Sequence, residues 1–379
     1  MYSKYPRILL LMHADRAYDR ALVMGILKYS RLHGPLAFLR SNPVLPGERH
    51  ALSRADILRW KPDGVLWREG HEFKPVAALG LPTIFFPDIK IKPGLCNVVT
   101  DDRAIGQRAA RHLMQRGLKH FAYLGLDDRH FWSRARKAAF RATLKAAGHP
   151  VEVFDVLKSK GLLSDWLARL PKPVGLMVCT DDCAMECLSA AGDAGLRIPQ
   201  DLAVVGAGND VMVCDFSNPP LSSVTLNLDE TGFRAAQRLH DMIRGRRTAG
   251  HITAKAFDVV ERQSSNFLSV EDDLVVQALQ FIHARRGMGV QVKDVVAPLP
   301  TSRRALYRKF KHYLGRSIAK EIRRVQMNQA ARMLVDTAMP IGEIAGALGF
   351  DALHNFSRSF SREKGVTPLK YRNQNSLLR

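Results

Sequence analysis

Short apolar runs alternate with stretches of helical periodicity through the first two thirds of the chain. The first run, Arg7–Met12, precedes a helix predicted over Asp19–Leu32. Runs of this length without polar alternation are typical of strands that are buried on both faces. Such strands alternating with helices predict parallel sheets built from βαβ units, and two series of them predict two lobes with a cleft between them.

The remaining elements of this region follow from the same pattern. The other predicted strands are Ala37–Arg40, Asp63–Trp67, Pro82–Phe86, His120–Leu126, Val151–Val156, Val174–Thr180 and Leu202–Gly208. Three other helices are predicted over Val76–Leu79, Asp102–Arg116 and Ser133–Ala147. Two more helical stretches are predicted to end at Trp60 and at Ala194.

The C-terminal third contains two predicted helix-turn-helix pairs instead. In the second pair, Ile341–Leu348 has helical spacing, Gly349 allows a tight turn, and Phe356 and Phe360 share one face of the next helix. The opposite face combines an imidazole, an amide and guanidinium groups, which can bind base edges and phosphates in a major groove. Those residues are His354, Asn355, Arg358 and Arg362. A solvated amphipathic helix pair is the alternative.

The first pair has the same arrangement, which favours the DNA-binding interpretation. A short helix from Val292 breaks at Pro298-Leu299-Pro300, and Thr301 or Ser302 can cap the basic helix that follows. A single helix over Ser317–Ala338 has no internal proline and connects the two pairs. Two such pairs on one helical spacer could address successive major-groove faces. In the first basic helix, Leu306 and Phe310 face the core, whereas Arg304, Tyr307, Arg308 and Lys311 project outward.

The last hundred or so residues resemble the AraC/XylS family of transcription regulators. The resemblance rests on GEIAGALGFDALHNFSRSFSREKGVTPLKYR (342–372), which is very close to the family signature. One departure is Ala-Pro-Leu-Pro at 297–300, where the family usually has a glycine turn, so the entry angle of the first reading helix stays open. The resemblance implies double-stranded DNA as a partner, contacted by Arg304, Tyr307, Arg308, Leu353, His354, Asn355 and Arg358.

Three earlier segments, at 100–125, 179–206 and 218–243, are similar to the effector domain of LacI/GalR repressors and periplasmic sugar-binding proteins. The combined resemblance implies an α/β two-lobed, periplasmic-binding-protein-like sensor with parallel sheets, followed by an all-α double helix-turn-helix domain. We expect the sensor to cover residues 1–265 and the DNA-binding domain to cover residues 266–379.

Sugar recognition needs carboxylates and guanidinium groups for hydroxyl pairs, and aromatic rings for C–H surfaces. On matching positions, the resemblance implies Arg136 and Asp181 as sugar contacts, and Trp132 as a ring that could stack on the sugar. Each has an alternative role, because Asp181 or Asp182 could cap a helix, Arg136 could be a solvated basic residue, and Trp132 could be packing, as could Tyr18. The other candidates are Asp15, Tyr18, Asp19 and Asn209.

Gly208 is the main departure from the sensor family. It stands in VVGAGND where the family has an acidic residue that contacts the sugar. Two alternatives follow: Asn209 or Asp210 replaces that contact from a shifted loop, or the ligand differs.

The composition narrows the class of partner. The net charge is +21, and residues 271–379 hold 19 Lys and Arg against 9 Asp and Glu, which favours a polyanion. No apolar run approaches the roughly 20 residues that span a bilayer, and Ile8–Met12 is too short for a signal peptide. Cys179, Cys183 and Cys187 recur at four-residue intervals, but no His joins them, so we expect packing rather than a metal site.

We therefore expect a cytoplasmic, ligand-responsive transcription regulator, an activator of carbohydrate genes, that acts without a cofactor. The resemblance implies a monosaccharide effector such as D-xylose, which closes the lobes and reorients paired DNA-binding domains in a homodimer that acts with RNA polymerase. The alternatives are a solute-binding receptor without DNA function and a regulator with a non-xylose ligand. An enzyme is not expected, since the chain has no Walker loop, nucleophile elbow or His-Glu-x-x-His motif.

Overall fold

The structure, a computed structural model, describes residues 5–12, 16–40, 53–70, 79–157, 159, 161–246, 249–266, 272–285 and 289–375. The chain forms two compact units, each assembled from three separate segments. The first comprises Met1–Ala104, Leu126–Ala138 and Leu226–Ala256, and the second comprises Ile105–Gly125, Ala139–Thr225 and Phe257–Arg379.

The first unit contains a six-stranded sheet in the order β11-β5-β4-β3-β1-β2. The pairs whose register is described all run parallel, with Leu9 beside Val65 and Leu66 beside Ile84. From β1 the chain adds β2 on one side and β3, β4 and β5 on the other, so the strand order reverses between β1 and β3. Parallel sheets usually bind their ligands at such a reversal. The strands are β1 (Arg7–Leu11), β2 (Ala37–Arg40), β3 (Gly64–Arg68), β4 (Thr83–Phe86), β5 (Cys96–Thr100) and β11 (Ile252–Ala254).

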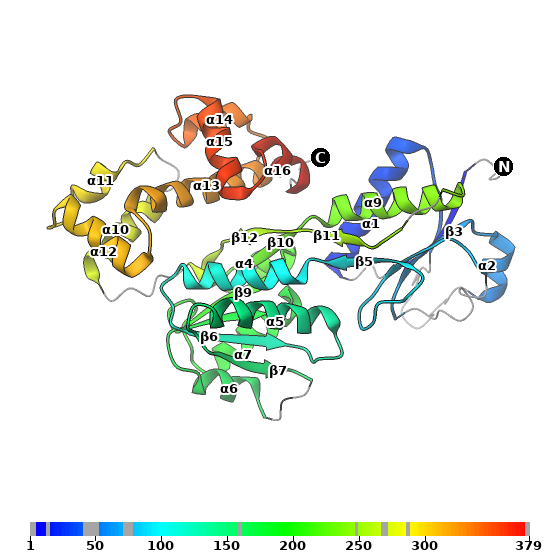
Figure 1. Ribbon diagram of the computed structural model, residues 1–379, viewed down its shortest axis with the longest axis horizontal. Helices are drawn as coiled ribbons and strands as arrows, with labels where there is room; N and C mark the ends of the chain where they lie inside the picture. Colours follow the sequence, from blue (N-terminus) through cyan, green and yellow to red (C-terminus); the bar gives the residue numbers. More distant parts are fainter. Residues whose placement is uncertain are drawn as a thin grey trace. The chain divides into compact units, whose positions relative to one another are not determined.

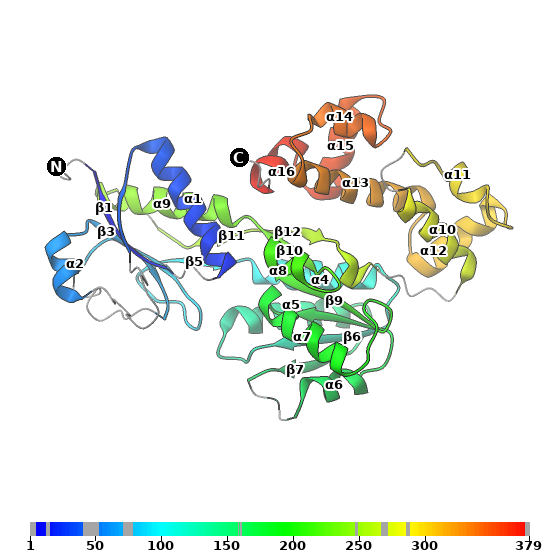
Figure 2. The ribbon, with the colours of Figure 1, turned by 180° about the vertical axis from the view of Figure 1, so that it is seen from behind.

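Two helices of this unit, α1 (Ala17–His33) and α9 (Leu228–Ile243), lie side by side in both views (Figures 1 and 2). Glycine permits the contact, because a Cβ at Gly25 would lie 1.9 Å from the backbone oxygen of Asp229. The Tyr29 hydroxyl is also 2.9 Å from His240 Nδ1. A further helix of this unit, α2 (Arg54–Trp60), is capped by Ser53.

The second unit repeats the sheet topology with the order β12-β10-β9-β8-β6-β7. Its strands are β6 (His120–Gly125), β7 (Val151–Asp155), β8 (Val174–Val178), β9 (Leu202–Gly208), β10 (Ser222–Leu226) and β12 (Ala256–Val260). Its helices in this region are α6 (Leu163–Arg169), α7 (Asp181–Asp193) and α8 (Val211–Phe216), while α4 (Asp102–Met114) and α5 (Phe131–Lys145) extend through both units. Cys187 and Cys214 are small packing residues of its hydrophobic core.

The predicted strands all form, with ends within about two residues of the expected ones. Sequence reasoning did not predict β5, β10, β11, β12, α6, α8 or α9. CNVVT and SSVTL, the sequences of β5 and β10, mix polar with apolar residues and therefore do not stand out as apolar runs. The predicted helix at Val76–Leu79 lies outside the described residues except for Leu79.

The described residues of the second unit after residue 271 form helices and the turns between them. Helix α13 (Ile318–Asp336) contributes to two separate hydrophobic cores, since Ile322 and Val325 pack in the first and Met327 and Leu334 in the second. The first core holds α10 (Asp273–Ala284), α11 (Val292–Val296) and α12 (Arg303–Leu314), and the second holds α14 (Ile341–Ala347), α15 (Leu353–Lys364) and α16 (Pro368–Asn375). Two parallel-sheet lobes followed by helices confirm the expected fold class.

Candidate DNA-binding and effector sites

The two basic helices, α12 and α15, each bury one apolar face and expose the opposite face. Leu306 and Phe310 anchor α12, and Phe356 and Phe360 anchor α15. Ser302 caps α12 by accepting a hydrogen bond of 3.2 Å from the Ala305 N–H, as the sequence suggested. The predicted DNA contacts are all exposed: Arg304, Tyr307, Arg308, Leu353, His354, Asn355 and Arg358.

The turns that precede these helices differ. In the second pair, Gly349 has a φ of +79°, and a Cβ there would lie 2.5 Å from the Cα of Gly289. In the first pair, two successive backbone hydrogen bonds make the turn without glycine: Leu299 N–H donates to Val296 O and Thr301 N–H donates to Leu299 O. The first turn, which contains prolines, and the second turn, which contains Gly349, therefore both connect two helices but have different backbone conformations.

In the first unit, polar side chains meet beyond the ends of β1, β3 and β4. Arg68, the last residue of β3, is only 6% exposed. Its Nε lies 3.6 Å from Oδ1 of the fully buried Asp19, and its Nη2 lies 3.4 Å from Asp88 Oδ1. Its Nη1 also donates to the Pro87 carbonyl at 3.2 Å. One buried guanidinium therefore joins the first turn of α1 to the loop after β4.

A second buried guanidinium lies at the start of α4. Arg136 Nε donates to Asp102 Oδ1 at 2.9 Å, and the Thr100 hydroxyl donates to the same oxygen at 2.5 Å. Burial raises the pKa of Asp102, although Arg136 opposes the shift. The neighbouring Asp101 has a different role, because it caps α4 by accepting from the Ala104 N–H at 3.0 Å.

Two aromatic rings lie against these charged groups. The first-lobe cluster, as we call it, consists of Tyr18, Asp19, Arg68, Asp88, Asp102, Trp132 and Arg136. The Arg68 guanidinium lies 5.3 Å from the centre of the Tyr18 ring, and that of Arg136 lies 4.9 Å from the centre of the Trp132 ring. The Trp132 indole N–H donates to Asp88 Oδ1 at 3.3 Å. Burial raises the pKa of the Tyr18 hydroxyl to about 12, so it stays a neutral donor. Carboxylates that accept hydrogen bonds, guanidinium groups that donate them and aromatic faces that pack against C–H groups together suit a polyhydroxy ligand.

The structure brings most of the predicted first-lobe residues together and adds others. Arg136 is not a solvated surface residue, because it is 5% exposed and paired. Sequence reasoning missed Arg68, Asp88 and Asp102 as members of the cluster. For Arg68 the available signal was a charged residue at the end of an apolar strand. Asp15 lies outside the described residues.

In the second unit, Asp181 is the first residue of α7, yet it does not cap the helix. Thr180 caps it instead, accepting from the Cys183 N–H at 3.2 Å. The Asp181 carboxylate accepts from the Ser223 hydroxyl at 2.6 Å and from the Asp210 N–H at 2.8 Å. Burial raises its pKa to about 6, although these hydrogen bonds oppose the shift. The capping alternative for Asp181 is therefore wrong.

Glycines in β9 make room for this carboxylate. A Cβ at Gly206 would lie 2.3 Å from Asp181 Oδ1, and a Cβ at Gly208 would lie 3.1 Å from Asp181 Oδ2. Gly208 also has a φ of +132°, a conformation that L side chains rarely adopt. A side chain at position 208 would therefore strain the backbone and crowd Asp181.

The side chain of Asn209 does not contact the Asp181 carboxylate but binds Arg262, whose Nη1 donates to the amide oxygen of Asn209 at 2.9 Å. The backbone N–H of Asn209 donates to the Ser223 hydroxyl at 3.0 Å. Arg262 in turn forms an ion pair of 2.6 Å with Asp215. Asn209 thus connects the end of β9 to the segment after β12.

Comparisons with known proteins agree with both halves of this description. Residues 110–265 match a periplasmic binding protein-like domain, and residues 296–374 match a helix-turn-helix domain. The chain is 27% identical over 394 residues to the xylose operon regulatory protein of Escherichia coli (strain K12), and the alignment covers 99% of each protein. The solved structure of the xylose-binding transcription activator xylR is also 27% identical, with a TM-score of 0.60 and coverage of 99% of this chain and 100% of that chain.

By these similarities, the chain is a transcription regulator of the helix-turn-helix type. It carries a periplasmic-binding-protein-like sensor, responds to a ligand and binds DNA; it is not an enzyme. The sensor fold also occurs in a periplasmic binding protein/LacI transcriptional regulator from Alkaliphilus metalliredigens QYMF, solved in complex with D-xylulofuranose. That structure is 14% identical, has a TM-score of 0.55, and covers 69% of this chain and 98% of that chain.

Within the described part of the regulator, no helix is both long enough and apolar enough to cross a membrane. The same residues contain no group of three or more His, Cys, Asp or Glu side chains placed to hold a metal ion.

In the regulator, the segment after β12 contacts the central helix of the DNA-binding region. Glu261 Oε2 lies 2.6 Å from Arg116 Nη2 and 3.2 Å from Arg324 Nη1, and it accepts from the Asn328 amide at 3.2 Å. Arg324 also pairs with Glu321 at 2.7 Å. Burial would raise the pKa of Glu321, but its arginine partners outweigh burial and lower it to about 2.

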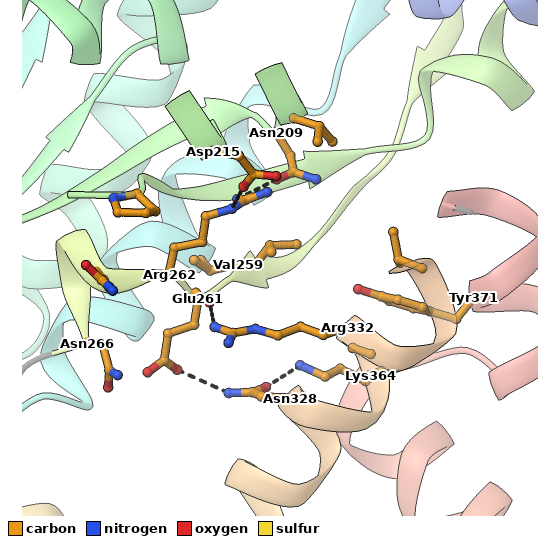
Figure 3. Close-up of a pocket in the computed structure, with 16 residues that line it drawn as sticks. Asn209, Asp215, Val259, Glu261, Arg262, Asn266, Asn328, Arg332, Lys364 and Tyr371 are labelled. Carbon is orange, nitrogen blue, oxygen red and sulfur yellow. Dashed lines mark hydrogen bonds and ion pairs between the residues drawn. The ribbon is translucent and has the colours of Figure 1, made fainter. Parts of the chain in front are cut away.

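A cavity of about 420 Å³ lies beside this segment (Figure 3). Arg262 points from it towards Asp215 and Asn209, whereas Asn328 lies between Glu261 and Lys364. Two adjacent residues, Glu261 and Arg262, therefore link α13 on one side to the loop after β9 on the other.

Proposed function

We propose that this regulator senses a neutral monosaccharide, a pentose such as D-xylose in particular, and controls carbohydrate-utilisation genes as an activator. The first-lobe cluster carries this proposal, because its two guanidinium–carboxylate pairs and its two rings match the hydroxyl and C–H surfaces of a sugar. The full-length similarity to xylose operon regulatory proteins supports the same effector class.

The residues proposed to bind the effector are those of the first-lobe cluster together with Asp181. Asp15 and Asn209 stay predictions from sequence. For DNA, we propose that the exposed faces of α12 and α15 contact bases and phosphates through Arg304, Tyr307, Arg308, Leu353, His354, Asn355 and Arg358.

We further propose that the regulator binds DNA as a homodimer, acts with RNA polymerase and works in the cytoplasm, where its DNA target would lie. Paired half-sites are the usual targets of dimeric helix-turn-helix proteins. The division between a sensor over 1–265 and a DNA-binding domain over 266–379 stays a prediction, as does closure of the lobes on the sugar.

Calorimetry on the full chain tests the effector assignment. D-xylose is titrated first, followed by a panel of pentoses and hexoses. We expect saturable binding that weakens at least tenfold in Arg68→Ala and Arg136→Ala, since each removes a buried guanidinium, whereas Arg141→Ala, at an exposed position on α5, should bind like the wild type. Binding of another sugar but not xylose would keep the regulator and replace its effector. Absence of binding across the panel would contradict sugar sensing.

A further inference from the structure

The hydroxyl of Thr225 is a buried polar group without a hydrogen-bond partner among the residues that the structure describes. The side chain is 5% exposed and lies near the end of β10. Buried hydroxyls in folded proteins almost always have a partner, because both the donor and the acceptor lose water on burial. A group left in this state is a candidate for pairing with a ligand.

The position of Thr225 in the sheet indicates what it faces. Side chains alternate along a strand, so Thr225 shares a face of β10 with Ser223, whose hydroxyl donates to Asp181. Across the sheet, Thr225 is the register partner of Gly208 on β9. Its hydroxyl therefore lies one step beyond the Asp181–Ser223 pair towards the carboxyl ends of the strands, where parallel sheets bind their ligands.

Gly208 itself supplies no acidic side chain at this level of the sheet, and Asp181 limits the space that a Cβ would need there. Thr225 offers a neutral hydroxyl at the same level of the sheet. A hydroxyl can both donate to and accept from a sugar hydroxyl, and the nearby Asp181 carboxylate disfavours an anionic ligand such as a sugar phosphate.

We infer that Thr225 determines effector specificity in the second lobe by hydrogen bonding to one hydroxyl of a neutral sugar, in place of the acidic contact that Gly208 cannot supply. This inference rests on the proposed sugar-sensing function and adds a residue that no sequence motif indicated.

Two substitutions in the full chain test it. Thr225→Val keeps the shape and removes the hydroxyl, whereas Thr225→Ser keeps the hydroxyl. Calorimetry with D-xylose, or with whichever sugar of the panel the wild type binds, should show affinity reduced ten- to hundredfold in Thr225→Val and within about threefold of wild type in Thr225→Ser. Thr253→Val, at an exposed threonine of β11, is the matched control and should bind like the wild type.

The stability of the sugar-free protein separates this role from a structural one. A hydroxyl that has no partner in the protein costs stability, so sugar-free Thr225→Val should melt at the wild-type temperature or above it. Wild-type affinity in Thr225→Val would overturn the inference while leaving sugar sensing intact. A lowered melting temperature of the sugar-free variant would also overturn it, by showing an internal partner. If the wild type bound no sugar, sugar sensing itself would fail, and this inference with it.

Discussion

At the scale of single residues, Asp181 shows how a site can be held ready at a cost in stability. Its carboxylate is almost completely buried and receives hydrogen bonds from Ser223 and Asp210, yet its pKa is still raised to about 6. Desolvation thus outweighs the two hydrogen bonds. No arginine or lysine within ion-pair distance of Asp181 is seen among the described residues, unlike Asp102 with Arg136.

The raised pKa of Asp181 predicts how the stability of the protein depends on pH. Because the folded pKa of Asp181 is raised from 3.8 to about 6, its contribution to stability is fully present below about pH 4 and is lost as pH rises through 6. A pKa shift of this size corresponds to roughly 3 kcal/mol in the free energy of unfolding. Asp181→Asn, which does not ionise, should therefore gain up to that amount relative to wild type between pH 4 and pH 7.

Urea unfolding of the full chain at several pH values measures the difference. The control is Asp182→Asn, which changes the exposed neighbour and should follow the wild type throughout. A difference between wild type and Asp181→Asn that does not vary with pH would show that the buried carboxylate does not ionise in this range.

At the scale of elements, the short segment that carries Glu261 and Arg262 connects the loop after β9 to α13. Glu261 contacts α13, which belongs to the cores of both helix-turn-helix pairs, and Arg262 contacts Asn209 in the loop that also donates to Asp181. A displacement of this loop would therefore change the hydrogen bond to Arg262, and with it the contact on α13.

Glu261→Gln tests this coupling. The amide cannot form the two ion pairs with Arg116 and Arg324, so we expect sugar affinity to stay within about threefold of wild type while the effect of sugar on operator affinity falls at least fivefold, as loss of about 1 kcal/mol of coupling would require. The measurements are calorimetry and a gel shift with and without sugar. Asp241→Asn, which removes the surface ion pair with Arg246, is the control. Full sugar control of DNA binding in Glu261→Gln would exclude this route.

At the scale of the whole molecule, the regulator presents two basic helices on one connecting helix. The strong positive charge of the chain supplies non-specific attraction to DNA, but the exposed faces of α12 and α15 would supply the choice of sequence. Each helix has its own hydrophobic core, so loss of one exposed side chain should leave both helices folded.

Arg304→Ala and Arg358→Ala should each weaken binding to the operator by about ten- to a hundredfold without changing the melting temperature. A gel shift on the region upstream of the regulated genes, repeated at two salt concentrations, separates base from phosphate contacts, since loss of a phosphate contact also lowers the salt dependence. Arg141→Ala serves as the control outside the helix-turn-helix pairs. Specific binding retained by both variants would exclude recognition by two helices.

Much of this protein could be predicted from local sequence. Apolar runs are enough to place the buried strands, because a strand covered on both faces needs apolar side chains throughout. The alternation of Phe356 and Phe360 with exposed polar residues likewise fixed the inner and outer faces of α15. Strands such as β5 and β10 escaped prediction because their polar residues satisfy partners that only the folded chain provides, as Ser222 does with the Arg262 backbone.

The roles of the site residues depended on tertiary structure. Whether Asp181 caps a helix or holds a loop, whether Arg136 is solvated or buried, and that Arg68 joins Asp19 and Asp88 are all decided by residues distant in sequence. The sequence alone determined the apolar strands, the faces of the two basic helices and the order of the two functions, since these follow from local periodicity and motif. Only the packed structure could decide which charges are buried together and which hydroxyl lacks a partner, because burial and pairing are properties of the assembled chain.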